Sequence, residues 1–308
     1  MKELKYVYGP VPSRRLGISL GISPIPKKTC NYSCIYCQLG RTDRMTNTRQ
    51  DFFPLADILE EVEYVLKSDI YFDVITIVGE GEPTLYRSLG LLIEEVQRRT
   101  DKPVAVITNG ALFYDSEIRK EIARADIVSP TLDAFDEASF KKINRPHGAL
   151  SYEKVMQGLK DFSAEYSGQL WLELMLIKDY NDDEISLQKY AKALQDIRYE
   201  RLYINTPVRP PAESSVHAAD RAQIEKAVDI LNGVSIDLLV SQGFHSEVTD
   251  DYQAILSIIK RHPMNQFEIE GFLETRDVKD IDGTISRLKA DPEVDTVNYK
   301  GYITFRLQ

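Results

Sequence analysis

Several residue types that often indicate a function are scarce in this chain. Its 308 residues include only three cysteines, four histidines and one tryptophan, and no run of 18 or more apolar residues. A helix that spans a bilayer needs about 20 such residues, so an integral membrane protein is not expected. The first residues, Met-Lys-Glu-Leu-Lys-Tyr, lack the apolar segment of a signal peptide. We therefore expect a cytoplasmic protein without membrane contact.

The chain also lacks an excess of basic residues. It carries 38 Lys and Arg against 48 Asp and Glu, a formal net charge of -10. Such a charge repels a phosphate backbone, so nucleic acid is not the expected partner. The hydrophobic share of 43% is that of an ordinary globular protein. The length suits one main domain with a small appendage.

Short apolar runs alternate with amphipathic stretches over most of the chain. Apolar runs bounded by turn residues predict buried strands, and apolar residues at helical spacing predict helices. Their alternation is typical of an α/β protein with βα units around a parallel sheet. The six predicted strands are 16–22, 73–78, 104–108, 127–132, 170–177 and 201–206. The predicted helices between them are 54–67, 88–99, 115–124, 151–165, 183–196 and 219–231.

The last quarter of the chain has a different pattern. After a possible last strand at 235–240, a polar stretch indicates a linker, which predicts domains at 1–245 and 246–308. Helices at 251–261, 266–274 and 278–290 precede a hairpin of strands 294–297 and 302–307. That order is winged-helix-like, which often means DNA binding. From His245 onwards, however, the sequence has eight Lys and Arg but twelve Asp and Glu. This acidic α+β domain is therefore better interpreted as a docking or lid domain.

All three cysteines lie within eight residues, at Cys30, Cys34 and Cys37, spaced C-x3-C-x2-C. An odd, clustered set in a cytosolic chain favours metal binding over disulfides. A structural zinc site takes four ligands, whereas the chain has no fourth cysteine and the nearest histidine is His147. Thiolates also bind iron-sulfur clusters. We therefore expect a [4Fe-4S] cluster whose fourth iron is open to a substrate or cofactor.

This motif, with Tyr36 directly before the third cysteine, resembles the signature of the radical S-adenosylmethionine (SAM) superfamily. The resemblance implies a partial (βα)6 barrel of the TIM type, with SAM as the second cofactor. In that family the methionyl amino and carboxylate groups chelate the open iron, and one electron cleaves the sulfonium to a 5′-deoxyadenosyl radical. It also implies that Tyr36 lies beside the adenine. The site is expected at the C-terminal ends of the strands.

Polar residues after the other predicted strands extend this site. Gly79, Glu80, Gly81 and Glu82 precede a proline after strand 73–78, and they resemble the family's Gly-Gly-Glu-Pro motif, whose backbone binds the methionyl amino group. Glu173 is an acid inside an apolar run, which calls for a polar partner such as a ribose hydroxyl. The other cofactor-binding candidates are Asn109, Ser129 and Arg209. The candidate substrate contacts are Arg14, Arg15, Asp133, Arg145 and His147.

The segment from Tyr8 to Arg41 also resembles iron-sulfur oxidoreductases related to the wyosine tRNA-base synthases. Those synthases carry a second cluster, for which this chain has no cysteines. We therefore expect a single-cluster enzyme that abstracts hydrogen from a small-molecule or peptide substrate, with electrons from a donor such as flavodoxin or ferredoxin. Three alternatives stay open: an activating enzyme for a glycyl-radical partner docked on the C-terminal domain, tRNA-base modification of the wyosine type, and a non-catalytic electron carrier.

Overall fold

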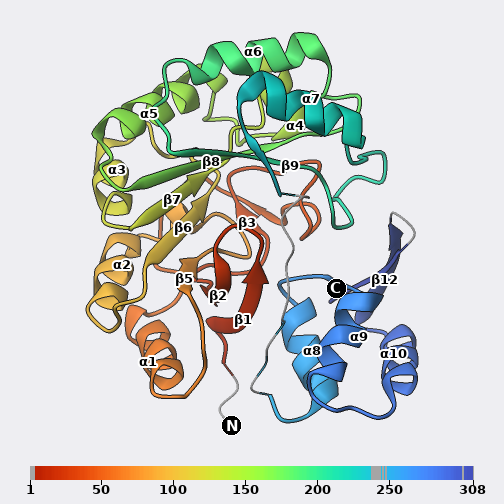
Figure 1. Cartoon of the computed structure of the whole chain (residues 1–308). Coiled ribbons are helices and arrows are strands. Elements are labelled where there is room, and N and C mark those ends of the chain that lie inside the picture. Colours follow the sequence, from red (N-terminus) through yellow and green to blue (C-terminus); the bar gives the residue numbers. More distant parts are fainter. Residues whose placement is uncertain (1–3, 237–243, 245, 247, 300–301, 308) are drawn as a thin grey trace.

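An eight-stranded sheet forms the centre of the molecule in the computed structural model, which describes residues 4–236, 244, 246, 248–299 and 302–307 (Figure 1). The strand order is β1-β2-β5-β6-β7-β8-β9-β10. β1 (Val7–Ser13) runs antiparallel to β2, and every other pair is parallel. The parallel strands are β2 (Gly17–Ile22), β5 (Val74–Ile77), β6 (Val104–Thr108), β7 (Ile127–Pro130), β8 (Gln169–Met175), β9 (Arg201–Asn205) and β10 (Val234–Ser235).

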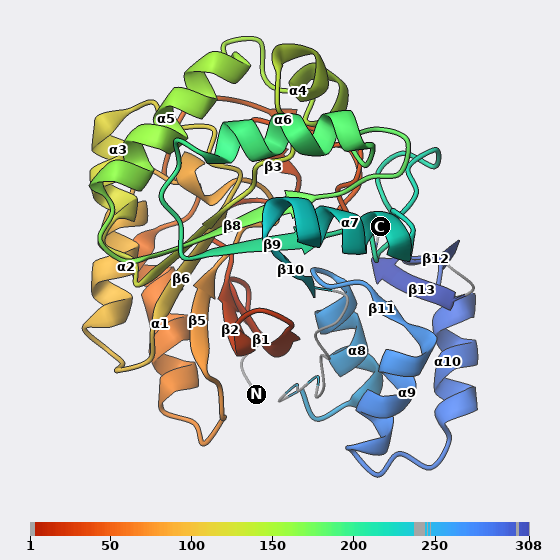
Figure 2. The same ribbon diagram turned by 45° about the horizontal axis from the view of Figure 1, so that its top comes forward.

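Helices follow the parallel strands and cover the outer face of the curved sheet (Figures 1 and 2). They are α1 (Leu55–Leu66), α2 (Leu89–Gln97), α3 (Ser116–Ile122), α4 (Glu137–Ile143), α5 (Tyr152–Glu165), α6 (Glu184–Leu194) and α7 (Arg221–Leu231). Among the described residues, β1 and β10 pair with no strand beyond themselves, so the sheet remains open. The predicted partial (βα)6 barrel is therefore confirmed.

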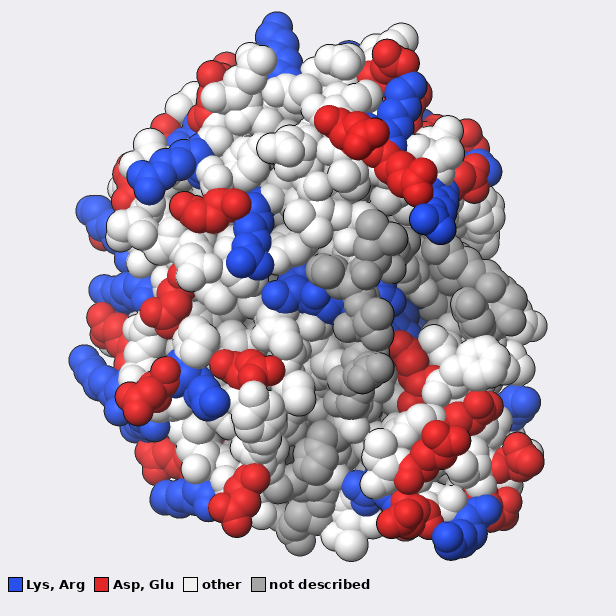
Figure 3. Space-filling view, in the orientation of Figure 1, with Lys and Arg blue, Asp and Glu red and all other residues white. Residues whose placement is uncertain are grey.

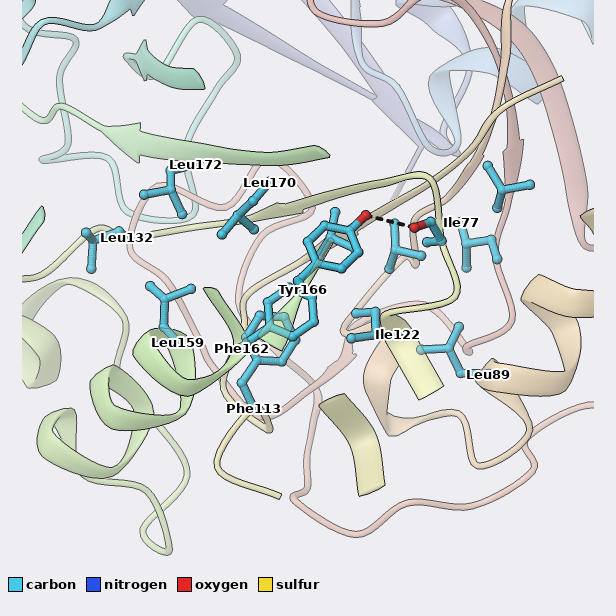
Figure 4. Close-up of a cluster of buried hydrophobic side chains, with 14 of the residues drawn as sticks. Ile77, Leu89, Phe113, Ile122, Leu132, Leu159, Phe162, Tyr166, Leu170 and Leu172 are labelled. Atoms are coloured by element: carbon cyan, nitrogen blue, oxygen red, sulfur yellow. Dashed lines mark hydrogen bonds between the residues drawn. The ribbon is translucent and has the colours of Figure 1, made fainter. Parts of the chain in front are cut away.

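The apolar pattern of the sequence explains these elements. All four residues of β5 are buried, as expected for a parallel strand covered on both sides. On α1, Ile58, Val62 and Val65 are buried at helical spacing. Figure 4 shows Phe113, Phe162 and Tyr166 in the core, where the last two rings stack at 4.8 Å. The Tyr166 hydroxyl donates a hydrogen bond to the Ala125 carbonyl at 2.8 Å.

The C-terminal segment forms a separate small domain beside the open edge of the barrel (Figures 1 and 2). Its elements are α8 (Asp251–Ile259), β11 (Met264–Asn265), α9 (Gln266–Glu274), α10 (Ile281–Ala290), β12 (Val294–Tyr299) and β13 (Tyr302–Leu307). The strands form an antiparallel sheet in the order β11-β13-β12 around a hydrophobic core of their own. This order of elements agrees with the predicted winged-helix-like domain.

Some sequence-based predictions differ from the structure. β1, α4 and the short parallel pair β3 (Thr29–Cys30) and β4 (Arg44–Met45) were not predicted. β10 coincides with the start of the predicted strand 235–240, and residues 237–240 lie outside the described residues. The boundary near residue 245 also lies outside them and stays a prediction. No helix in the described part of the chain has the length and apolar character to cross a bilayer.

Candidate active site

The cysteine loop, residues 30–37, follows β2, the first parallel strand. Cys30, Cys34 and Cys37 form no disulfides and are each partly exposed. The loop is fixed to its surroundings, because the Ile35 N–H donates to the Ile143 carbonyl at 3.0 Å and Thr42 Oγ1 donates to the Tyr32 carbonyl at 2.6 Å. The three thiols are thus carried by a segment that the barrel holds in place.

Two asparagine amides lie beside the sulfur atoms. Nδ2 of Asn109, after β6, lies 3.7 Å from Cys30 Sγ, and Nδ2 of Asn144, at the end of α4, lies 3.5 Å from Cys34 Sγ. The Tyr32 N–H lies 3.4 Å from Cys30 Sγ. Donors of this kind stabilise a thiolate and tune the potential of a cluster bound to it.

The surroundings of the thiols fit an iron-sulfur cluster. Burial raises the pKa of all three thiols, and the nearby Glu82 and Asp133 carboxylates raise the pKa of Cys30 and Cys34 further. Thiolates therefore form here when a metal supplies positive charge. No three His, Cys, Asp or Glu side chains of the described segments converge closely enough to hold a single metal ion. Three sulfurs that bind three different irons of a cluster need not converge in this way.

The turn at residues 79–83 is joined to the chain just before Cys30. The Lys28 N–H donates to the Glu80 carbonyl at 2.5 Å, and the Glu82 N–H donates to the Thr29 carbonyl at 3.1 Å. A Cβ on Gly81 would lie 1.8 Å from the Thr29 carbonyl oxygen, so only glycine fits this approach. The two motifs that were separate in the sequence are thus neighbours in space.

Glu82 connects the ends of β5 and β6. Its side chain is 2% exposed, and its carboxylate accepts hydrogen bonds from the Thr84 N–H and hydroxyl, the Thr108 hydroxyl at 2.6 Å and the Asn109 N–H at 2.7 Å. Burial raises the pKa of this carboxyl group, and these hydrogen bonds oppose the rise. Four protein donors therefore hold the carboxylate, which fixes Asn109 beside Cys30.

Asp133 has a similar role at the ends of β7 and β8. The Tyr36 hydroxyl donates to its carboxylate, as do Asn144 Nδ2 at 3.0 Å and the Met175 N–H at 3.1 Å. Asp133 is 3% exposed, and burial raises its pKa. The residue was predicted as a substrate contact, whereas the structure surrounds it with protein donors. It links Tyr36 to Asn144, whose Nδ2 lies 3.5 Å from Cys34 Sγ.

Glu173, Ser129 and Arg15 form a polar group inside the barrel. Glu173 forms an ion pair with Arg15 and accepts a hydrogen bond from Asn205 Nδ2 at 2.8 Å. The guanidinium of Arg15 also lies 3.4 Å from the Ser129 hydroxyl. Burial lowers the pKa of Arg15 to about 10. Two predicted cofactor contacts and one predicted substrate contact are thus brought together, and Arg15 is the partner of the buried acid.

Arg209 is located at the contact with the C-terminal domain. Its guanidinium forms a two-pronged ion pair with Glu268 of α9 and lies 3.0 Å from His262 Nε2. Arg209 was predicted to bind a carboxylate of the cofactor or substrate. In the structure, its guanidinium binds the carboxylate of Glu268. Burial lowers the pKa of His262 well below its ordinary value, and the nearby Arg209 and Arg14 lower it further.

Two of the remaining predicted residues, Arg145 and His147, contact the cysteine loop, since the Ser33 N–H donates to the Arg145 carbonyl at 3.2 Å. Arg145 pairs with Glu213, a residue that was not predicted and that also binds Arg41 at 2.9 Å. The His147 N–H donates to the Asn31 carbonyl at 2.8 Å, and its ring Nδ1 accepts from the Ala149 N–H. Arg14 lies in the turn between β1 and β2. Glu213 is 172 residues from Arg41, so no local signal indicates its role.

Comparisons with known proteins identify the family of this chain. The sequence model of the radical SAM superfamily matches residues 25–190. A UPF0026 protein of Methanocaldococcus jannaschii is 36% identical over 310 residues, which cover 97% of this chain and 94% of that protein. A GTPase Obg of Brachyspira hyodysenteriae is 40% identical over 225 residues, and the chain spans only 33% of its length. A solved structure of TYW1 with a lysine-pyruvate adduct bound has a TM-score of 0.54 at 19% identity, covering 72% of this chain and 74% of that one.

An open parallel barrel with a three-cysteine loop after its first parallel strand defines a radical SAM enzyme, and the chain belongs to the radical SAM superfamily. Within this class it is a member of the UPF0026 family, as its likeness to the Methanocaldococcus protein over nearly the full length shows. Its cofactors are a [4Fe-4S] cluster and SAM, as predicted. The likeness to TYW1 shows the fold alone.

Proposed function

We propose that the chain binds one [4Fe-4S] cluster through Cys30, Cys34 and Cys37 and uses SAM to abstract a hydrogen atom from a small-molecule or peptide substrate. The observation that carries this proposal is the cysteine loop joined to the turn at 79–83, in a chain with no further cysteine. Three thiolates leave one iron without a protein ligand. The neighbouring turn offers backbone groups to the methionyl part of SAM.

The residues around the loop have separate roles in this proposal. When held by Cys30, Cys34 and Cys37, the cluster would supply the one-electron reduction that cleaves SAM and so allows hydrogen to be taken from a substrate C–H bond. Asn109 and Asn144 donate toward the thiolates of Cys30 and Cys34, and Asp133 holds Tyr36 on the adenine side. The barrel interior, with the Arg15 and Glu173 pair, excludes water and positions the substrate. A flavodoxin or ferredoxin is the proposed electron donor.

The test is anaerobic. The full chain is reconstituted with iron and sulfide, supplied with dithionite and SAM, and 5′-deoxyadenosine is measured by mass spectrometry. We expect slow formation of 5′-deoxyadenosine that the right substrate accelerates. Cys34→Ala should keep the fold and form none, whereas undiminished formation in that variant would refute the site.

The same assay separates the substrate classes. Stimulation by the dialysable fraction of a cell extract supports a small-molecule or peptide substrate. Stimulation only by the protein fraction would favour an activating enzyme for a glycyl-radical partner, and stimulation by tRNA would favour base modification. A reduced, intact cluster that yields no 5′-deoxyadenosine under any of these conditions would favour an electron carrier.

A further inference from the structure

The side chain of Glu80 connects the turn at 79–83 to the C-terminal domain. Its carboxylate Oε2 lies 3.3 Å from Nε of Arg261, two residues after the end of α8. Both side chains are buried, since Glu80 is 9% exposed and Arg261 is 8% exposed. A residue of the cofactor turn therefore has its charged partner in the other domain.

Arg261 also contacts the N-terminal part of the barrel. Its guanidinium donates to the Lys5 carbonyl at 2.7 Å and lies 4.9 Å from the centre of the Tyr8 ring on β1. The Tyr8 ring in turn covers Gly21 of β2, where a Cβ would lie 2.2 Å from the ring. Arg261 is thus enclosed by β1, by the residues before it and by the turn.

The pair is incompletely hydrogen-bonded. Glu80 Oε1 and Arg261 Nε are buried and have no hydrogen-bond partner among the residues that the structure describes. A buried charge in such a place depends on its opposite partner, because water cannot replace it. Without the guanidinium, the Glu80 carboxylate loses its buried charged partner, and we expect its side chain and the turn to shift.

A shift of the turn reaches the cofactor site directly. The Glu80 carbonyl accepts from the Lys28 N–H, and the Glu82 N–H donates to the Thr29 carbonyl, directly before Cys30. Arg209 and Glu268 form a second contact between the domains, at the loop after β9. Figure 3 shows acidic side chains, with a few basic ones among them, over the exposed face of the C-terminal domain.

We propose that the C-terminal domain is part of the SAM site, because Arg261 holds Glu80 and so fixes the turn that binds the methionyl group. Arg261 is a positioning residue and does not touch SAM itself. The inference rests on the proposed function, since it assigns the turn at 79–83 to SAM. It gives the winged-helix-like domain a role in closing the open edge of the barrel in place of DNA binding.

The test measures equilibrium binding of SAM to the anaerobically reconstituted full chain. Arg261→Gln is expected to weaken binding by about tenfold, as is usual when a residue that supports a ligand contact is lost, with iron and sulfide content unchanged. The double variant Arg261→Gln with Glu80→Gln leaves no unpaired buried charge. It is expected to bind SAM at least about threefold more tightly than Arg261→Gln alone.

Arg276→Gln is the matched control, because Arg276 binds Asp251 and backbone carbonyls inside the C-terminal domain. It should leave SAM affinity within about twofold of the wild type. The inference would be overturned if Arg261→Gln bound SAM as tightly as the wild type. It would also be overturned if Arg276→Gln lost as much SAM affinity as Arg261→Gln, or if the double variant bound SAM no more tightly than Arg261→Gln. If Arg261→Gln does not fold, Arg261→Lys replaces it in the test. Arg261→Lys is expected to bind SAM about threefold more weakly than the wild type, and wild-type affinity in this variant would also overturn the inference. A wild-type chain that holds its cluster but binds no SAM would instead refute the proposed function.

Discussion

Two groups of carboxylates, in the barrel and at its contact with the C-terminal domain, are stabilised in different ways. In the neutral-donor group, Glu82 and Asp133 accept hydrogen bonds from hydroxyl, amide and backbone groups. Neither takes part in an ion pair within the described ranges. In the arginine-paired group, Glu80, Glu173 and Glu268 each face a guanidinium. The first group surrounds the cysteine loop, and the second lies inside the barrel and toward the C-terminal domain.

The two groups differ in how the charge of each carboxylate is balanced. An arginine-paired carboxylate is neutralised within the protein. Burial raises the pKa of both Glu82 and Asp133, which shows that hydrogen bonds compensate only part of the cost of their charge. The arginine-paired group serves to hold elements and domains together.

The largest effect is expected from Glu82→Ala in the neutral-donor group. This change leaves four buried donors without an acceptor and should lower the free energy of unfolding of the barrel by about 4 kcal/mol. The measurement is urea denaturation followed by fluorescence of Trp171, the one tryptophan, which is buried in the barrel. Glu82→Gln, which keeps one acceptor oxygen, is the control, and its free energy of unfolding should fall by less than that of Glu82→Ala. Equal stability of wild type and Glu82→Ala would contradict the role of this carboxylate.

The second prediction concerns the arginine-paired group. Arg15→Met leaves the carboxylate of Glu173 buried without its cation. This change should lower the free energy of unfolding by about 3 kcal/mol. The double variant with Glu173→Met removes both charges and should be more stable than Arg15→Met in the same urea assay. A double variant that is less stable than the single one would show that Glu173 has another strong partner, which would break the distinction between the two groups.

The sequence predicted much of this arrangement but not its interactions. Apolar runs located the parallel strands β2, β5, β6, β7, β8 and β9, because strands covered on both sides are continuously apolar. β1 was missed because it contains Pro10 and Pro12, which a sheet tolerates only at an edge such as this one. The cysteine spacing indicated the cofactor chemistry, whereas the hydrogen bonds of Glu82 and Asp133 depend on strand ends that meet only after folding. Contacts such as Arg261 with Glu80 join distant segments, so no local pattern predicts them.

The third prediction tests the amide donors beside the sulfurs. Asn144→Leu removes the donor to Cys34 and to Asp133, and should cost about 2 kcal/mol of stability. It should also make the midpoint potential of the reconstituted cluster more negative, because a hydrogen bond to sulfur stabilises the reduced state. The measurement is a redox titration followed by electron paramagnetic resonance. Gln97→Leu, whose amide on α2 donates to the Arg124 carbonyl at 2.9 Å, is the control. An unchanged potential in Asn144→Leu would argue against tuning by this residue.

The smallest effect is expected at Glu213, outside the buried groups. Hydrogen bonds from Arg41 and Arg145 lower its pKa from 4.5 to about 2. A lowered carboxyl pKa contributes stability above pH 4.5 that is lost as the pH falls toward 2. Glu213→Gln should therefore cost about 1 kcal/mol at pH 7, since water screens the exposed Arg41. Urea curves of the two proteins should converge as the pH falls from 4.5 to 2, and a constant difference would exclude the charge as its cause.

We propose that three cysteines hold a cluster whose fourth iron binds SAM beside the turn at 79–83. Electron paramagnetic resonance of the dithionite-reduced, reconstituted chain tests it most directly, with spectra recorded before and after SAM is added. We expect one [4Fe-4S] cluster per chain, whose g-values shift when SAM binds. A spectrum that SAM leaves unchanged, from a protein with full iron content, would contradict the account.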